Sequence, residues 1–273
     1  MNNNIIRNAL AIASLFMLLQ VSAANAEEFR GKVVKVKGDV HVIDAQGKRT
    51  RVDDSKFLVR ELDTIVTDKG GNVIVQFNDG AMTVLDEKSS LQVEKTNWLS
   101  HLGGKIYFTF RKIFGQPRQV KTAFATLGVR GTTFIVYNDE NGKGVALAEG
   151  QLEVESPGPD FEIHRKQQMD EFEAFKQQAY EQQQALKKEF DDYRNRMQKD
   201  FVEYKKNFTL EADHVIRFDG TRVDETTMDD NTKADFATFE KEAGDMLIEF
   251  RKQASEYKEK MEQEQQQDAP KDN

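Results

Sequence analysis

The fold is decided by residues 121–154, which read KTAFATLGVRGTTFIVYNDENGKGVALAEGQLEV. A first strand ends near Thr126, and an alternating strand runs through Tyr137 to the dipeptide Asn141-Gly142. Asn-Gly between alternating apolar runs is the strongest short-range signal for a β-hairpin. Two more short strands follow and close at Val154, so the stretch predicts adjacent strands joined by tight turns.

Arg130, Gly131 and Thr132 are the most particular part of this stretch. A single Gly between an arginine and a β-branched run indicates a bulge or tight corner where only Gly fits. With its flanks, the stretch resembles the signature of the FecR domain family, in which a T-x-x-A-x-x-(V)RGT-x-F-x-V strand pair precedes a G-x-V-x-V strand. The resemblance implies that Arg130 is a structural arginine that pairs with a carboxylate near the corner.

The resemblance covers about Gly31 to Val154. Residues 63–67 (DTIVT) are similar to the family's GD-x-I-x-T segment, and residues 77–80 (FNDG) are similar to its F-x-DG. Leu62 stands where the family usually has Gly. The turn there must either avoid a positive φ angle or be strained in reaching it.

Residues 27–155 read as short alternating runs separated by turn residues about every ten positions, which favours a sandwich, barrel or solenoid of β-strands. A Gly-led strand recurs at Gly38, Gly71 and Gly150, with irregular spacing, and favours stacked short strands. FecR-like domains resemble elongated, solenoid-type β structures. The resemblance therefore implies a β-solenoid or elongated β-sheet domain.

Residues 156–160 break this pattern with two prolines around a glycine, and we interpret them as a linker. Apolar residues at helical spacing then predict a long helix over 161–208 and a second over 232–262. The connection at 209–231 contains a predicted β-hairpin, and residues 263–273 are expected to be disordered. The two amphipathic helices are expected to pack as an antiparallel hairpin or coiled coil; a second copy of the chain or a foreign protein are the alternative partners.

The N-terminus has the three parts of a secretory signal peptide over residues 1–26. Arg7 supplies the positive region, Ala9 to Leu19 is apolar, and Ala24-Asn25-Ala26 is a small-x-small cleavage site. The alternative is an uncleaved anchor, but the apolar run is short for a membrane span. We expect a mature chain with no transmembrane segment in the periplasm or outside the cell.

The composition excludes several kinds of chemistry. The chain has no cysteine, which excludes disulfides, thiol catalysis and lipoprotein attachment. The four histidines are scattered without metal-ligand spacing, and no nucleotide or hydrolase motif is present. An acidic loop containing Asp219, Asp224 and Asp229 lacks the order of an EF-hand, although loose Ca²⁺ binding is an alternative. The sequence thus predicts no enzyme activity, no cofactor and no metal site.

One stretch of positive charge suggests a binding surface. Residues 96–138 contain no acidic residue, and their cations alternate with aromatic side chains. The candidate binding residues are Lys105, Arg111, Lys112, Arg118 and Lys121. Such a face could dock an envelope protein or an anionic polymer such as peptidoglycan or lipopolysaccharide; nucleic acid is a poor candidate in the periplasm. The alternative is an intramolecular contact with residues 161–273, which carry 19 basic and 28 acidic residues.

These features predict a non-catalytic binding or scaffolding protein of the cell envelope. The β domain would recognise a partner, and the helical arm would space or oligomerise it. The alternative is an accessory role in envelope signalling, because the FecR proteins that the chain resembles are transmembrane regulators linking an outer-membrane receptor to a cytoplasmic sigma factor. No cytoplasmic domain precedes the predicted signal peptide, so a direct anti-sigma role is not expected.

Overall fold

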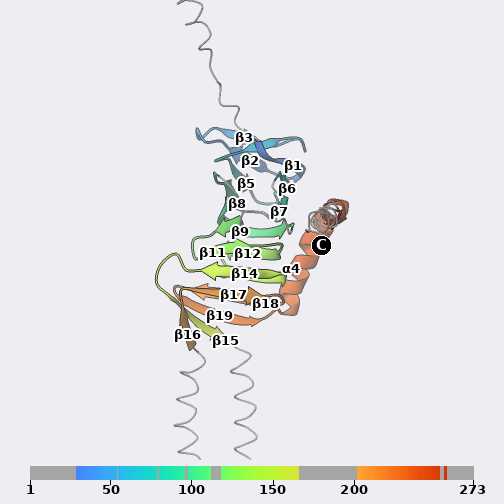
Figure 1. Cartoon of the computed structure of the whole chain (residues 1–273). Coiled ribbons are helices and arrows are strands. Elements are labelled where there is room, and N and C mark those ends of the chain that lie inside the picture. The colour runs from blue at the N-terminus through green and yellow to red at the C-terminus, as the bar shows by residue number, and fades with distance from the viewer. Residues whose placement is uncertain are drawn as a thin grey trace, which may run out of the picture.

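Two β-sheets packed face to face form most of the computed structural model, which describes residues 29–53, 55–78, 80–95, 98–111, 118–165, 202–252 and 255–256. The predicted signal peptide lies outside these residues, as do the predicted tail and residues 166–201. Strands stack along one long axis, from β2 and β3 at one end to β15 and β16 at the other (Figure 1).

The first sheet, which we call sheet A, is a ladder of neighbouring strands. In spatial order it contains β4 (Leu58–Arg60), β1 (Phe29–Lys37), β6 (Asn72–Phe77), β7 (Ala81–Leu85), the second half of β9 (Trp98–Phe110), β12 (Thr133–Asp139), β13 (Gly142–Glu149), β18 (His214–Asp219), β19 (Arg222–Thr227), β15 (Phe161–Arg165) and β16 (Val202–Lys205).

The second sheet, sheet B, is joined to sheet A through the long strand β9. In spatial order it contains β3 (Arg49–Arg51), β2 (Val40–Ile43), β5 (Thr64–Thr67), β8 (Ser90–Val93), the first half of β9, β10 (Arg118–Lys121), β11 (Thr126–Val129), β14 (Gln151–Glu155) and β17 (Asn207–Glu211).

Alternation along the strands creates the core between the sheets. In β6, Val73 and Val75 point inward, whereas Ile74 between them points to the outer face of sheet A. The inner core includes stacked Phe108, Phe110 and Phe134 and extends to residues far along the chain: Phe161, Phe208, Leu210, Ile216, Phe218 and Val223. The C-terminal strands are therefore part of the same core as the N-terminal ones.

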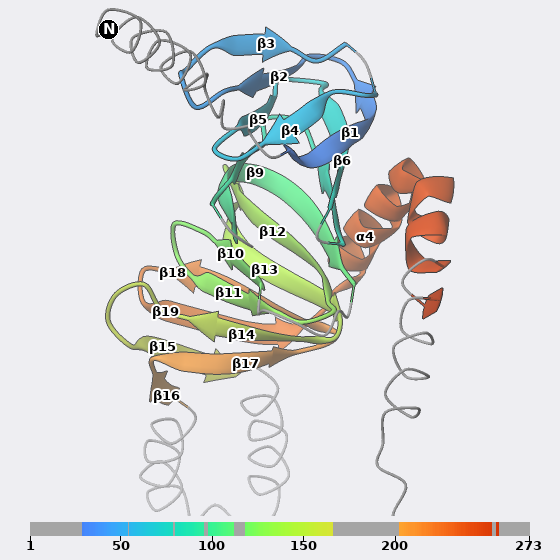
Figure 2. The same cartoon turned by 45° about the horizontal axis from the view of Figure 1, so that its top comes forward.

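The outer face of sheet A is covered by α4 (Asp230–Ala243) and by a helical stretch at residues 245–252 (Figure 2). Asp229 caps α4 by accepting a hydrogen bond from the Thr232 N–H at 2.8 Å. Gly244, with φ of 50°, ends it. The buried side of these helices consists of Phe236, Phe239, Ala243, Leu247 and Phe250, which pack on Ile74, Met82, Val84, Tyr107, Ile135, Ala146 and Val215.

Tight corners, where the chain passes from one sheet to the other, require glycine. Gly38 has φ of 69°, and a Cβ atom there would lie 2.3 Å from the Gly70 carbonyl oxygen. Gly104, in the middle of β9, has φ of 79°, and its Cβ would lie 2.3 Å from Ser89 Oγ. The corners thus stack on one another without room for a side chain. Leu62 has φ of 65°, so the turn that lacks the family's glycine takes the strained conformation.

Several features of the predicted fold class are wrong. The sheets are not a solenoid: pairings between described strands are antiparallel except β9–β10 and β15–β19. The described ends of the predicted helix at 161–208 are strands, β15 at one end and β16 and the start of β17 at the other. Phe161 and Ile163 in β15, and Phe208 and Leu210 in β17, alternate with polar residues, which is the period of two typical of a strand.

The predicted coiled coil is also wrong for the described residues. The helix expected at 232–262 is divided by a break at Gly244 into the 14-residue α4 and the helical stretch at 245–252. The apolar face of this segment was predicted correctly, but its partner was not. The face packs on the apolar outer face of sheet A rather than on another helix. The hairpin expected in the 209–231 connection is β18–β19, and it extends sheet A beside β13.

A pair of glycine substitutions tests the stacked corners. Gly38→Ala should lower the free energy of unfolding by about 3 kcal/mol, because both its φ angle and the adjacent Gly70 carbonyl oppose a Cβ. Gly47→Ala is the matched control: Gly47 also has a positive φ, of 82°, but nothing lies within 4 Å of its Cβ position. We expect a cost of about 1 kcal/mol there. Equal costs in urea unfolding would contradict close stacking of the corners.

A second pair tests the helix on sheet A. Phe239 is 3% exposed and its ring stacks on Tyr107 with centroids 5.8 Å apart. Phe239→Ala should cost about 3–5 kcal/mol of unfolding free energy. Ile248→Ala, at a position 66% exposed on the same segment, should cost less than about 0.5 kcal/mol. A small loss for Phe239→Ala would mean that the helix is not packed as described.

Candidate functional site

The structure divides the predicted basic surface between two places. Lys105 lies on the outer face of sheet A, where its Nζ is 2.8 Å from Asp235 Oδ2 of α4. The Arg111 guanidinium lies over the Phe250 ring, 4.4 Å from its centroid. Burial lowers the pKa of Arg111, and the nearby Arg118 lowers it further. Lys105 and Arg111 thus contact the C-terminal helical segment, the intramolecular partner considered from the sequence.

Arg118 and Lys121 lie on β10 of sheet B. Lys121, at the end of β10, is exposed, and its Nζ lies 4.3 Å from the centroid of the Trp98 ring. Arg118 begins the same strand and lies 5.8 Å from the Phe110 ring centroid. Lys112 is outside the described residues. Lys105 and Lys121 are separated because the chain leaves sheet A after β9 and enters sheet B at β10.

Arg130, Gly131 and Thr132 form the corner between β11 and β12. Gly131 has φ of 67°, and Thr132 is buried against the next corner, where a Cβ on Gly150 would come within 2.7 Å of Thr132 Cγ2. The positive φ at Gly131 and the close approach of Gly150 to Thr132 account for glycine at these two positions. Arg130 is exposed and makes no ion pair with any residue in the described part of the chain, so the expected carboxylate is not found there.

The described helices pack on sheet A, and none of them lies over the outer face of sheet B (Figure 1). Because Leu99, Val120, Leu127, Val154 and Leu152 point into the core, their neighbours point outward. The strand register aligns the outward residues in one row across four strands: Trp98, Gln119, Gly128 and Glu153. Sequence reasoning did not select Trp98, Gln119 or Gly128; inward–outward alternation along β9, β10 and β11 was the signal that could have found them.

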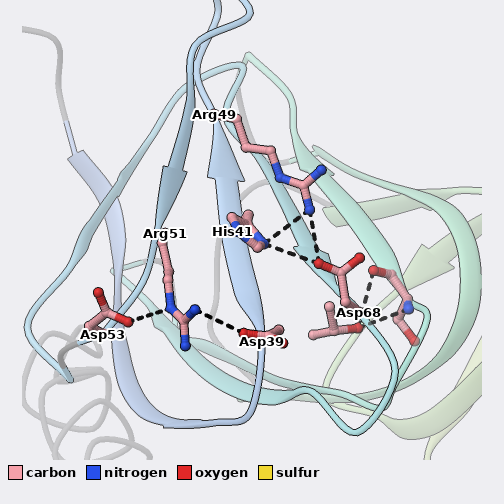
Figure 3. Close-up of polar contacts among 8 residues, drawn as sticks. Asp39, His41, Arg49, Arg51, Asp53 and Asp68 are labelled. Carbon is pink, nitrogen blue, oxygen red and sulfur yellow. Dashed lines mark hydrogen bonds and ion pairs between the residues drawn. The ribbon is translucent and has the colours of Figure 1, made fainter.

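A second polar group lies toward the β3 end of the molecule (Figure 3). Arg49 donates to Asp68 Oδ2 at 2.9 Å and lies 3.0 Å from His41 Nδ1. Arg51 bridges Asp39 and Asp53 at 3.1 and 2.7 Å, and its carboxylate neighbours raise its pKa. Each arginine is paired with at least one aspartate, so the charges within each pair cancel. Because the pairs are exposed, they stabilise the β2–β3 hairpin only weakly.

The residues of the predicted acidic loop have separate roles. Asp224 accepts from Arg222, Asp229 caps α4, and Glu225 Oε2 lies 3.0 Å from Arg165 Nε. Arg165 also contacts Glu203 Oε2 at 2.9 Å, which joins the ends of β15 and β16. Within the described ranges, no three His, Cys, Asp or Glu side chains are placed to hold a metal ion.

One buried histidine gives the fold a pH dependence. His101 is 2% exposed, and its Nε2 lies 3.0 Å from the Gly104 carbonyl oxygen, to which the neutral ring donates. Burial lowers its pKa from 6.5 to about 4. The unfolded chain therefore binds a proton at a higher pH than the folded chain does. Stability is complete above pH 6.5 and is lost as the pH falls toward 4.

We predict that acidification from pH 7 to pH 4 removes about 3 kcal/mol of unfolding free energy through His101. His101→Gln should flatten this part of the profile, whatever its cost at pH 7. His214→Gln, at a half-buried position, is the control and should keep the slope. Urea unfolding at several pH values is the measurement; parallel profiles for His101→Gln and the parent chain would contradict the assignment.

The described residues contain no helix with the length and apolarity needed to cross a membrane. A search of curated proteins gave no match. Two crystal structures of a candidate anti-sigma factor from Parabacteroides distasonis ATCC 8503 are similar to the chain. One has 15% identity and a TM-score of 0.41, covering 64% of each chain; the other has 16% identity and a TM-score of 0.39, covering 61% of this chain and 60% of that one. The chain thus spans less than two thirds of that protein, and likeness at this level does not establish a shared fold.

The family comparison is more informative. The matched segment begins at Asp63, after the strained Leu62, and ends at Glu153 on β14. It contains the FNDG turn between β6 and β7 and the Arg130-Gly131-Thr132 corner. Residues 63–153 match the model of the FecR protein family, and this confirms the resemblance for that part of the chain.

Proposed function

We propose that the protein is a non-catalytic accessory component of envelope signalling of the FecR type, which acts through binding. The observation that carries the proposal is the family match over residues 63–153. The candidate anti-sigma factor named above is consistent with a regulatory role but adds no independent weight. The signal-peptide pattern of residues 1–26 supports a location in the periplasm or outside the cell.

The chemistry of the described residues supports binding rather than catalysis. Charged groups that come together are ion pairs with structural roles, such as Arg165 with Glu225 and Lys105 with Asp235. The buried His101 is held neutral at neutral pH inside the core, away from the outer surfaces. The outer face of sheet B, by contrast, is not covered by either described helical segment, so its outward side chains offer a binding surface.

A scaffolding role is the second candidate. The exposed Tyr204, 68% exposed on the edge strand β16, supports it, because an aromatic side chain on a sheet edge is a frequent element of protein interfaces. Self-association through the helical arm is no longer favoured for the described helix, since the apolar face of α4 is covered by sheet A.

Deletion of the gene, with transcript measurement before and after envelope stress, separates the two roles. Signalling predicts that a small, defined set of transcripts changes and that a wild-type copy restores it. Photo-cross-linkers at Tyr204 and at Ile248 should then capture a membrane-spanning regulator or an outer-membrane receptor. Unchanged transcripts, together with capture of structural envelope components alone, would contradict signalling and support the scaffold.

A further inference from the structure

The outer face of sheet B carries a group of side chains that belong to neither hydrophobic core. We call Trp98, Gln119, Lys121, Gly128 and Glu153 the Trp98 patch. Strand pairing fixes their order: Trp98 is opposite Gln119, Gln119 is opposite Gly128, and Gly128 is opposite Glu153. They come from four adjacent strands, so the patch is held by a rigid support.

Trp98 supplies an aromatic surface outside both hydrophobic cores. It is partly exposed, and Lys121 Nζ lies 4.3 Å from the centroid of its ring. A cation over an aromatic ring at an exposed site is held weakly. A ligand ring can therefore replace the lysine on the indole, and the freed ammonium group can then donate to an acceptor on the ligand.

Gln119, beside Trp98, has an acceptor that the fold leaves unsatisfied. Its Oε1 is buried and has no hydrogen-bond donor among the described residues. A buried acceptor without a partner is costly, so turning the Gln119 side chain outward to accept from a ligand hydroxyl or N–H gives Oε1 the hydrogen bond that it lacks. Glu153 offers a second acceptor on the far side of Gly128.

Gly128 has no side chain of its own between these two acceptors, and Glu153 Oε2 lies 3.6 Å from the position that a Cβ on Gly128 would take. Its φ is not positive, so the backbone conformation does not demand glycine there. A Cβ would lie 3.2 Å from Glu153 Cβ, a close contact, and any longer side chain would fill the row between Gln119 and Glu153. The glycine therefore leaves this position of the row without a side chain of its own.

We propose that the Trp98 patch binds a glycan made of N-acetylated amino sugars. The apolar face of a sugar ring stacks on Trp98, as amphipathic aromatic residues permit. Sugar hydroxyls and the amide N–H donate to Gln119 Oε1 and the Glu153 carboxylate, and the acetyl carbonyl accepts from Lys121. The two acceptors and one donor of the patch match the donors and the acceptor of this sugar. Glu153 disfavours polyanions, which separates this occupant from a lipid phosphate or a nucleic acid.

This site goes beyond the signalling role and does not depend on it. Trp98 is the single tryptophan of the chain, so its fluorescence reports on the patch directly. The full-length protein is titrated with the hexamer of N-acetylglucosamine and, in parallel, with cellohexaose, which lacks the acetamido groups. We expect a saturable change in emission with the first ligand and binding about tenfold weaker with the second.

Single substitutions test which side chains of the Trp98 patch contact the glycan. Gln119→Leu and Lys121→Met should each weaken binding about tenfold, and Trp98→Ala, followed by calorimetry, should abolish it. Lys37→Met, which removes a lysine charge from an exposed position of β1, is the matched control and should bind as the parent chain does. Absence of any fluorescence or calorimetric response, equal affinity for cellohexaose, or equal affinity of Lys121→Met and Lys37→Met would overturn the proposal.

Discussion

Burial of both faces of sheet A is the constraint on which the rest of the structure depends. Val73 and Val75 of β6 enter the core between the sheets, whereas Ile74 enters the core under α4. The same division occurs in β9, where Phe108 points inward and Tyr107 packs on Phe236 and Phe239. A sheet with two apolar faces needs a cover on each side. Sheet B covers one side, and the C-terminal helical segment covers the other.

This constraint determines where function can reside. The outer face of sheet A is occupied, and polar contacts anchor its cover: Asn72 Nδ2 donates to Glu242 Oε2 at 2.6 Å, and Lys35 Nζ donates to the Glu242 carbonyl at 2.7 Å. Lys105 and Arg111 belong to the same contact and stabilise the fold. The outer face of sheet B has no such cover among the described residues, so its outward side chains are the ones available to a ligand.

The sequence predicted the local elements better than their partners. The hairpin at Asn141-Gly142 is β12–β13 and the one at residues 78–80 is β6–β7, because both depend on turn residues alone. The apolar face of α4 followed from its spacing, but spacing does not say whether that face meets a helix or a sheet. The strands at 161–165 and 202–211 were missed because each is a short alternating run beside a longer helical pattern. Strand alternation alone indicates that Trp98, Gln119 and Gly128 point outward, but their assembly into one patch depends on the register of β9, β10, β11 and β14, on which residue spacing carries no information.

Hydrogen exchange of the full chain tests most directly whether the C-terminal strands and α4 complete the β domain. We expect peptides from residues 207–227 and 230–247 to exchange as slowly as those from β9 and β12, because the same two cores hold them. We also expect mild denaturant to release all four sets together. Exchange of 207–247 within seconds, with β9 and β12 still protected, would show instead that the C-terminal part is an independent arm.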